Sequence, residues 1–302
     1  MPTIFPHRFA AVLVVVPFLT IGLPASTRAN VPFPPLNQPA LSEHRPGKFV
    51  WADLFTADPE AATKFYTGLF GWTASTIAQD DKTYTVFSNG SRPVAGLAPR
   101  QRSHANRPSR WIGYIAVTDL PAALKLVTKA GGKVRAPDRD FPNRGTQAII
   151  ADSEGSLVGL LRSSSGDSAD DEPRPGDWNW FELYARQPQA TTAFYRNVVA
   201  YEMAPDLRTE RKNDFILSSG GLARAGVAPL PDREDAKPGW LGVVRVAQID
   251  EAVARAVKLG GAVLVAPRPA AYESRFAIIS DPTGGIIGLV EYVNDANPAN
   301  RP

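Results

Sequence analysis

The run Phe49–Phe55 alternates like a strand with two different faces, and Asp53 is its one polar residue. One face is suited to lie under a helix and carries Val50, Ala52 and Leu54. The other face carries Trp51, Asp53 and Phe55. Because successive side chains of a strand point to opposite sides, we expect this second set to face away from the helix.

A helix is predicted directly after this strand. Asp58 is a favourable N-cap, Pro59 suits the first helical position, and Gly71 favours the end of the helix. Turn residues then separate three further predicted strands, at Thr73–Ile77, Tyr84–Ser88 and Val94–Ala98.

The same order of elements returns in the next sixty residues. A strand at Trp111–Val117 precedes a helix over 121–129, which Gly131 and Gly132 stop. Three more strands are predicted at Lys133–Ala136, Gln147–Ala151 and Leu157–Arg162. Each unit therefore has the order strand, helix and three strands, βαβββ.

Both units are repeated later in the chain. Trp51 recurs as Trp180 and Asp53 as Glu182, 129 positions on, and the offset holds for most of a hundred residues. A repeat of this length indicates a duplicated domain, not an array of small repeats. The inward-facing residues of the second copy are expected to be Trp180, Glu182 and Tyr184.

We therefore expect an α+β fold of four βαβββ units. Two such units can pair their curved sheets into an open cup with the helices outside. The sequence leaves open whether a cup forms within one copy or by exchange between the copies, and it leaves the oligomeric state open.

The first 29 residues have the pattern of an export signal. His7 and Arg8 precede an apolar run, Phe9–Leu23, and the small residues around Ala29 offer a cleavage site. A membrane anchor is the alternative, but the run is short for a membrane span and Pro17 interrupts it. We expect a secreted or periplasmic protein with no membrane attachment after cleavage.

Composition divides the remaining chain. Residues 30–46 contain five prolines and are expected to form an extended tether. The two copies occupy residues 47–163 and 177–293, an acidic Ser-, Gly- and Pro-rich segment at 164–176 is expected to be a solvated linker, and residues 294–302 form a tail.

Charge and cysteine content exclude several classes of function. Loss of Arg8 and Arg28 from the 33 basic residues leaves 31 against 30 acidic residues, so nothing favours nucleic acid as a partner. The chain has no cysteine, which excludes disulfides and thiol chemistry.

The two strand–helix openings, WADLFTADPEAATKFYTGLFGW and WFELYARQPQATTAFYRNVVAY, resemble the vicinal oxygen chelate superfamily. The closing strands DSEGSLVGLLR and DPTGGIIGLVEY resemble it equally. Glyoxalase I, extradiol dioxygenases and bleomycin-resistance proteins belong to this group. The resemblance implies two tandem glyoxalase-like cups over nearly all of the mature chain. It says little about function, because the superfamily includes isomerases, dioxygenases, lyases and binding proteins.

This chain departs from the family where metal-using members hold their metal. The resemblance implies ligands on the first, fifth and eighth strands, usually His, Gln or Glu. Those positions here are Trp51, Ile112 and Gly159 in the first copy and Trp180, Leu241 and Gly288 in the second. None of these side chains offers the nitrogen or oxygen donors that a divalent metal needs. His104, in a predicted loop, is expected to be solvated. We therefore expect no metal and no other cofactor.

Each cup then presents a tryptophan with a carboxylate two residues along. The tryptophans either stack on a small organic ligand or fill the cup as core, and on either reading Gly159 and Gly288 are expected to leave space for the opposing indole. A carboxylate in an apolar cup must be paired or hydrogen-bonded, or else acts as a base. Glu182 has Arg245 as a candidate partner, and Asp53 has Tyr84 or Tyr114.

These observations lead to three hypotheses. The first is a metal-free protein that binds a small, partly apolar molecule through Trp51, Phe55, Tyr84, Tyr114, Trp180, Tyr184 and Arg245. The second is an enzyme: a lyase or isomerase with Asp53 or Glu182 as general base, or a diverged metal-dependent glyoxalase or dioxygenase. The third is a non-enzymatic scaffold for a partner protein. The sequence favours the first, but it identifies neither the ligand nor which of the two cups is functional.

Overall fold

The computed structural model describes residues 33–79, 82–100, 107–207, 209, 213–232 and 236–292. The expected signal peptide at 1–29, His104 and the tail at 294–302 lie outside these residues. Within them, no helix is long and apolar enough to cross a membrane.

The first copy contains two βαβββ units, as the pattern predicts. The elements of its first unit are β1 (Phe49–Thr56), α1 (Pro59–Phe70), β2 (Thr73–Gln79), β3 (Lys82–Asn89) and β4 (Arg92–Pro99). Those of its second are β5 (Arg110–Ala116), α2 (Leu120–Lys129), β6 (Lys133–Phe141), β7 (Gly145–Ala151) and β8 (Leu157–Ser163). The predicted caps are confirmed: Asp58 accepts a hydrogen bond from the Ala61 amide, and Gly71 ends α1 with φ +71°.

The second copy repeats this order. Its first unit is β9 (Trp178–Ala185), α3 (Pro188–Val199), β10 (Glu202–Pro205), β11 (Phe215–Ser219) and β12 (Leu222–Pro229). Its second is β13 (Gly239–Arg245), α4 (Ile249–Lys258), β14 (Ala262–Ala270), β15 (Ser274–Ser280) and β16 (Ile286–Tyr292).

Each copy folds into its own eight-stranded sheet. The strand orders are β2-β3-β4-β1-β5-β8-β7-β6 and β10-β11-β12-β9-β13-β16-β15-β14. The first strands of the two units, β1 and β5, lie antiparallel at the centre, as do β9 and β13. The open question of pairing is thereby answered, because each cup forms within one copy.

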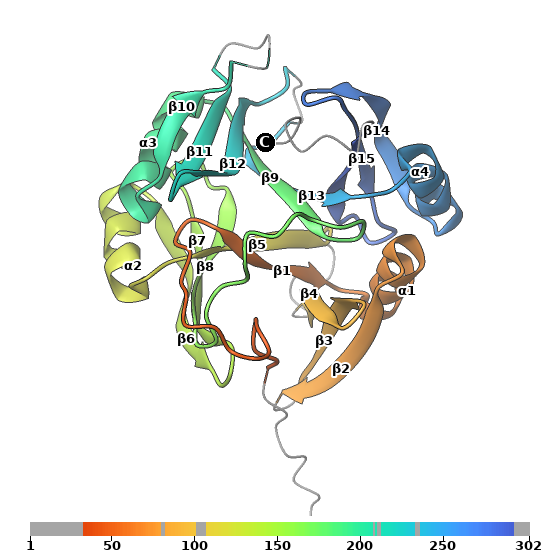
Figure 1. The fold of residues 1–302 in the computed structure, drawn as a ribbon, viewed down its shortest axis with the longest axis horizontal. Coiled ribbons are helices and arrows are strands. Elements are labelled where there is room, and N and C mark those ends of the chain that lie inside the picture. The colour runs from red at the N-terminus through yellow and green to blue at the C-terminus, as the bar shows by residue number, and fades with distance from the viewer. Residues whose placement is uncertain are drawn as a thin grey trace, which may run out of the picture.

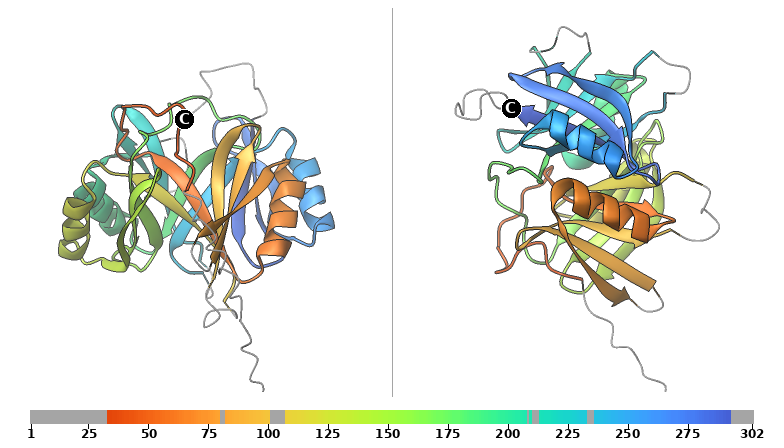
Figure 2. Two further views of the ribbon diagram at one scale, coloured as in Figure 1. Left: turned by 90° about the horizontal axis from the view of Figure 1, so that it is seen from below. Right: turned by 90° about the vertical axis from the view of Figure 1, so that its right-hand side faces the viewer.

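The helices hold the two copies together. Helix α1 packs against α4 and α2 against α3, so each helix meets one from the other copy (Figure 1; Figure 2). Two hydrophobic cores result, and each contains residues from both copies: one includes Leu54 and Ile279, the other Ile115 and Leu183. The concave faces of the sheets point away from these cores.

Two matching clusters of hydrogen bonds link the copies. The Tyr66 hydroxyl donates to Asp281 Oδ2 at 2.8 Å and accepts from Trp111 Nε1 at 2.8 Å. In the other half, Tyr195 donates to Asp152 at 3.1 Å and accepts from Trp240 at 2.8 Å. Each tyrosine is fully buried, so burial and the neighbouring carboxylate raise its pKa well above the usual value.

The segment expected to be an extended tether is bound across the first cup. We call its described part, residues 33–46, the strap. In Figure 1 it is the red-orange segment that runs between β6–β8 and β2–β4. Ser165 holds it: the Leu36 amide donates to Ser165 Oγ at 3.0 Å, and the Leu41 amide donates to the Ser165 carbonyl at 2.8 Å. The linker is thus a docking site for the strap, which its solvated composition did not predict.

Candidate functional site

The first cup is lined from β1 largely as the alternation predicts. Trp51 is 3% exposed and packs with Tyr84, Tyr114, Ile112 and Leu161 on the concave face, and Phe55 packs against the edge of this cluster. Ala52 and Leu54 lie in the core beneath α1. The placement of Val50 under the helix was wrong. A register shift between Phe49 and Trp51 puts Phe49 on the helix side and Val50 against the cup residues.

Asp53 is buried at the centre of this cup and accepts several hydrogen bonds. Its Oδ1 atom accepts from Trp51 Nε1 at 2.8 Å and from the Tyr84 hydroxyl at 2.5 Å. Tyr114 also donates to this carboxylate. Burial and the charge of Asp53 raise the pKa of both tyrosines well above the usual value, so they remain donors at neutral pH. Of the alternatives left open by the sequence, hydrogen bonding to both tyrosines is the one found.

Two small residues make room for this cluster. A Cβ atom at Gly96, the register partner of Asp53, would lie 1.7 Å from the Tyr84 hydroxyl oxygen and 2.3 Å from Asp53 Oδ1. A Cβ atom at Gly159 would lie 2.1 Å from the Tyr114 ring. The expectation that Gly159 leaves space for the Trp51 indole was therefore wrong: the ring that needs the space belongs to Tyr114, which is the register partner of Gly159 on β5.

Arg144 completes the first cup and was missed by the sequence analysis. It lies in the turn between β6 and β7 and is 1% exposed, with its guanidinium carbon 3.9 Å from the centroid of the Trp51 ring. Such a distance is typical of a cation–π contact. The segment Asn143-Arg144-Gly145 indicated a hairpin turn, but no sequence pattern shows to which side a turn residue points.

The strap closes this cup. The Phe33 ring lies 4.5 Å from that of Tyr84 and 4.9 Å from that of Phe141, centroid to centroid, and Leu36 joins the same cluster. Phe33 is 9% exposed. The predicted ligand-binding residues Trp51, Tyr84 and Tyr114 are therefore packed in one cluster with the strap, and all three are buried.

The second cup has the same framework, but the residues of its wall are less buried. Trp180, Glu182 and Tyr184 are half-buried, whereas Trp51 and Asp53 at the matching positions are buried. Trp180 Nε1 donates to Glu182 Oε2 at 2.8 Å, the same contact as between Trp51 and Asp53. A Cβ atom at Gly226 would lie 2.0 Å from Glu182 Oε2, so glycine again makes room for the carboxylate.

Arg245, the predicted partner of Glu182, lies further along β13. The register partner of Glu182 is Leu241, four residues before Arg245. Arg245 Nη1 donates to Glu172 Oε1 at 2.8 Å and to the Pro173 carbonyl at 2.6 Å, and its guanidinium lies 5.3 Å from the centroid of the Tyr292 ring. The linker thus supplies acceptors for this buried arginine.

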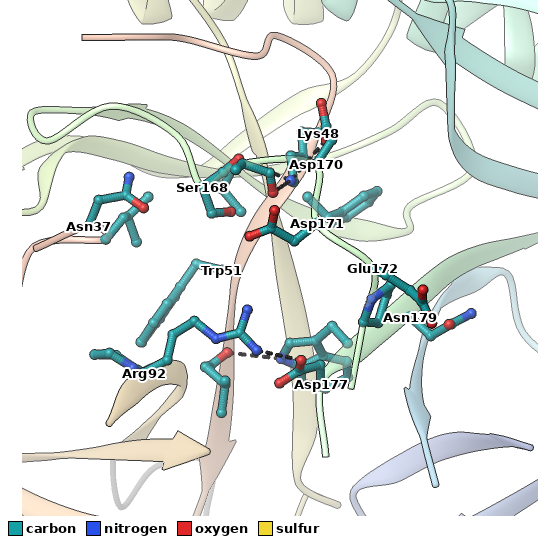
Figure 3. Close-up of a pocket in the computed structure, with 18 of the residues that line it drawn as sticks. Asn37, Lys48, Trp51, Arg92, Ser168, Asp170, Asp171, Glu172, Asp177 and Asn179 are labelled. Atoms are coloured by element: carbon teal, nitrogen blue, oxygen red, sulfur yellow. Dashed lines mark hydrogen bonds and ion pairs between the residues drawn. The ribbon is translucent and has the colours of Figure 1, made fainter. Parts of the chain in front are cut away.

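A cavity of about 880 Å³ separates the entrances of the two cups. The strap, the linker and the first halves of β1 and β9 line it, and both Trp51 and Trp180 contribute to its wall. Figure 3 shows Trp51 in this wall together with Arg92 and Asp170. Charged residues from both copies surround it. Asp170 pairs with Lys48 at 2.9 Å and with Arg224, and Arg92 pairs with Asp177. On its second-copy side, half-buried Trp180, Asn179 and Tyr292 adjoin Arg245.

Comparison with known protein families covers both copies. Residues 48–160 match the Glyoxalase/Bleomycin resistance protein/Dioxygenase superfamily, and residues 180–290 match a glyoxalase-like domain. This chain belongs to the glyoxalase superfamily. The resemblance that the strand–helix openings indicate is thereby confirmed, as is the tandem α+β fold.

Relatives of similar length support this assignment. The "Putative glyoxylase CFP32" of Mycobacterium tuberculosis is 31% identical over 256 residues, which cover 84% of this chain and 98% of that protein. The anthracycline biosynthesis protein DauV of Streptomyces sp. (strain C5) is 30% identical over 86% of this chain and 98% of its own length.

Solved structures share the fold at low sequence identity. A Mn(II)-bound glyoxalase from Novosphingobium aromaticivorans aligns over 82% of this chain and 83% of its own, with a TM-score of 0.56 and 16% identity. The 2,3-dioxygenase LapB from Pseudomonas sp. KL28 aligns over 83% and 93%, with a TM-score of 0.57 and 12% identity. At such identities the likeness concerns the fold alone.

The metal of other glyoxalase-superfamily members does not fit the donors in either cup. At the ligand positions of the second cup, Trp180, Leu241 and Gly288 project an indole, an isobutyl group and a hydrogen atom. Gly288 is packed closely by Val243 and Phe276, not by the Trp180 indole as expected. Within the described ranges, no group of three or more His, Cys, Asp or Glu side chains is arranged to hold a metal ion.

Proposed function

We propose that this glyoxalase-superfamily protein binds a small, partly apolar organic molecule without a metal, at the entrance of its second cup. The observation that supports the proposal is the difference between the two cups. Trp180 and Tyr184 are partly accessible, and Trp180 lines the cavity of about 880 Å³, whereas the first cup is closed by the strap. Apolar pockets with a few polar groups are the usual form of small-molecule sites.

The chemistry of the cavity wall suggests what such a ligand contains. Trp180 and Tyr292 offer aromatic surface, and Arg245 and the Asn179 amide offer hydrogen-bond donors beside it. The ligand is therefore expected to combine an aromatic or apolar body with an oxygen-bearing group.

The test is a binding screen on the whole mature chain. A panel of small aromatic and aliphatic metabolites is added to the wild type, to Trp180→Ala and to Val257→Ala, a control on the exposed side of α4. A ligand of the second cup raises the melting temperature of the wild type and of the control, with a reduced shift for Trp180→Ala. Equal shifts in all three proteins, or no ligand in the panel, would count against the proposal.

A catalytic role is the second candidate, and the accessibility of Glu182 favours it over Asp53. Asp53 is buried with three donors around it, whereas Glu182 is half-buried. A general base must be reached by the proton it removes. Once a ligand is known, binding and turnover of that ligand are measured in the wild type and in Glu182→Gln. A binding protein keeps its affinity and shows no turnover in either form. A lyase or isomerase retains binding in Glu182→Gln but loses turnover.

Export is part of the proposal. The support is the signal pattern of residues 1–29, including the site after Ala29. Expression of the whole chain with fractionation of the cells and N-terminal sequencing tests it. Exported protein is expected to begin at Asn30, and a chain that keeps its first residues in the cytoplasm would contradict it.

A further inference from the structure

The first cup contains a buried cation that the proposed site in the second cup does not use. Arg144 is 1% exposed, and its Nη2 atom is buried without a hydrogen-bond partner within the described residues. None of the carboxylates in those residues lies within ion-pair distance of it. A buried charge of this kind costs free energy unless another group satisfies it.

The acceptor that Arg144 does have comes from the strap. Its Nε atom donates to the Pro34 carbonyl at 3.0 Å, and its guanidinium carbon lies 5.8 Å from the centroid of the Phe33 ring. The Phe33 ring itself packs between Tyr84 and Phe141. An aromatic ring and an oxygen acceptor, held side by side, therefore occupy the cup.

The strap is attached to the cup without being part of either sheet. It belongs to neither of the two cores that the copies share, and it lies in the separate cluster around Trp51. Its backbone is fixed mainly through Ser165 and Asp167 of the linker. The residues that fill the cup can therefore leave it without breaking a strand pairing.

We propose that Arg144 anchors a second binding site, for a small aryl carboxylate, and that the chain's own Phe33 and Pro34 compete for this site. The ring of the ligand takes the place of the Phe33 ring between Tyr84 and Phe141. Its carboxylate takes the place of the Pro34 carbonyl, and its second oxygen satisfies Nη2. The planar fork of a guanidinium matches the two oxygens of a carboxylate, which a single carbonyl oxygen cannot do.

Asp53 shares the cup but does not neutralise Arg144. Its Oδ1 accepts from Trp51 and Tyr84, and Tyr114 donates to the same carboxylate, so its hydrogen-bond donors are residues other than Arg144. Trp51 separates the two charged groups, with its indole N–H toward Asp53 and its face toward Arg144. Arg144 is left as the cation for an incoming anion.

The strap is expected to weaken the apparent affinity of the wild type. An attached segment competes at a high effective concentration, and a ligand that binds only the open form has its affinity reduced by the fraction that is open. Phe33→Ala removes the ring that fills the cup and leaves both cores unchanged, so it raises the open fraction. This site is in the first copy, whereas the site proposed above is in the second. Failure of one proposal therefore leaves the other unaffected.

Calorimetric titration with benzoate tests the proposal on the whole mature chain. Phe33→Ala is expected to bind benzoate at least tenfold more tightly than the wild type. The double variant Phe33→Ala/Arg144→Gln is expected to bind benzoate at least tenfold more weakly than Phe33→Ala. The affinity of Phe33→Ala/Arg144→Lys is expected to lie between those of these two variants, because lysine keeps the charge but not the planar fork of the guanidinium. The affinity for benzyl alcohol, which has the ring without the carboxylate, is expected to increase little from the wild type to Phe33→Ala.

Two further measurements separate the outcomes. Circular dichroism melting shows whether each variant is folded, and the lysine variant keeps the test valid if Arg144→Gln does not fold. Phe33→Ala/Trp180→Ala removes the aromatic wall of the other site. Benzoate binding that is retained in this double variant therefore assigns the ligand to the first cup. The proposal is overturned if Phe33→Ala binds no more tightly than the wild type, if the gain survives both substitutions of Arg144, or if it disappears with Trp180.

Discussion

Single glycines determine how much space the side chains of each cup have. Gly159 and Gly288 occupy the same position in the two copies, but a Cβ atom would meet the Tyr114 ring at 2.1 Å in one and Val243 at 3.0 Å in the other. We expect Gly159→Ala to lower the free energy of unfolding by about 1–3 kcal/mol, the usual cost of overpacking a core.

Gly288→Ala is the matched control, and it is expected to cost clearly less. Urea unfolding followed by circular dichroism measures both. Equal losses in the two variants would contradict this, because they would mean that Tyr114 gives way as easily as Val243 does.

At this scale the sequence shows which side chains face a cup, but not what surrounds them. The alternation along Phe49–Phe55 was sufficient to place Trp51 and Asp53 together on the concave face. It did not reveal the bulge that turns Val50 to the same side, because a register shift depends on the partner strand. The position of Arg144 in the cup was not predicted, because the direction of this turn residue depends on its left-handed neighbour, Asn143 at φ +69°, and on the strap that contacts it.

Among the elements, α1 and α3 contribute the tyrosines that join the copies. Tyr66 on α1 connects Asp281 with Trp111, and all three are buried. We expect Tyr66→Phe to lower the free energy of unfolding by about 1–3 kcal/mol, since it leaves two buried groups without a partner. Tyr195→Phe on α3 is expected to cost a similar amount, because its cluster is the counterpart. Thermal unfolding measures both, and a loss below about 0.5 kcal/mol in each would show that water replaces the hydroxyl.

The linker joins the strap to the second copy through Asp170. This carboxylate pairs with Lys48 at 2.9 Å, with Arg45 at 3.3 Å and with Arg224 on β12. Burial alone would raise its pKa, but the hydrogen bonds from Arg224 and Lys48 outweigh burial and lower the pKa from 3.8 to about 2. The composition of the segment indicated a solvated linker because it shows charge but not the partners of that charge.

A lowered pKa in the folded state has a defined consequence for stability. The contribution of Asp170 is fully present above the ordinary pKa near 4 and is lost as the pH falls through about 2. Because the group is partly exposed, we expect only about 1 kcal/mol. Urea unfolding of the wild type and Asp170→Asn from pH 6 to pH 2 tests this, with Asp138→Asn at an exposed position of β6 as control. The difference between wild type and Asp170→Asn should shrink toward pH 2, and a constant difference would contradict the assignment.

The whole molecule is two sheets around cores that neither copy can complete alone. One core combines β1 and α1 with α4, β15 and β16, and the other combines β5, α2, β7 and β8 with β9, α3 and β12. The stacked rings of Phe49 and Phe181, 4.0 Å apart at 6°, lie where the two copies meet. The repeat of 129 residues predicted two domains. Their sharing of cores could not be read from it, since an apolar helix face does not show whether it packs only on its own sheet or also against the other copy.

We therefore expect the two copies to unfold together. If each copy were an independent domain, a chain of this length would show two transitions; shared cores couple them, so one cooperative transition is expected. Differential scanning calorimetry of the mature chain checks this through the ratio of calorimetric to van't Hoff enthalpy, which is near one for a single unit. A fragment of residues 33–176 is expected to be unfolded or to bind a hydrophobic dye, because it exposes half of each core. Two separate transitions, or a fragment that unfolds cooperatively by itself, would show that the helix contacts α1–α4 and α2–α3 contribute little to stability.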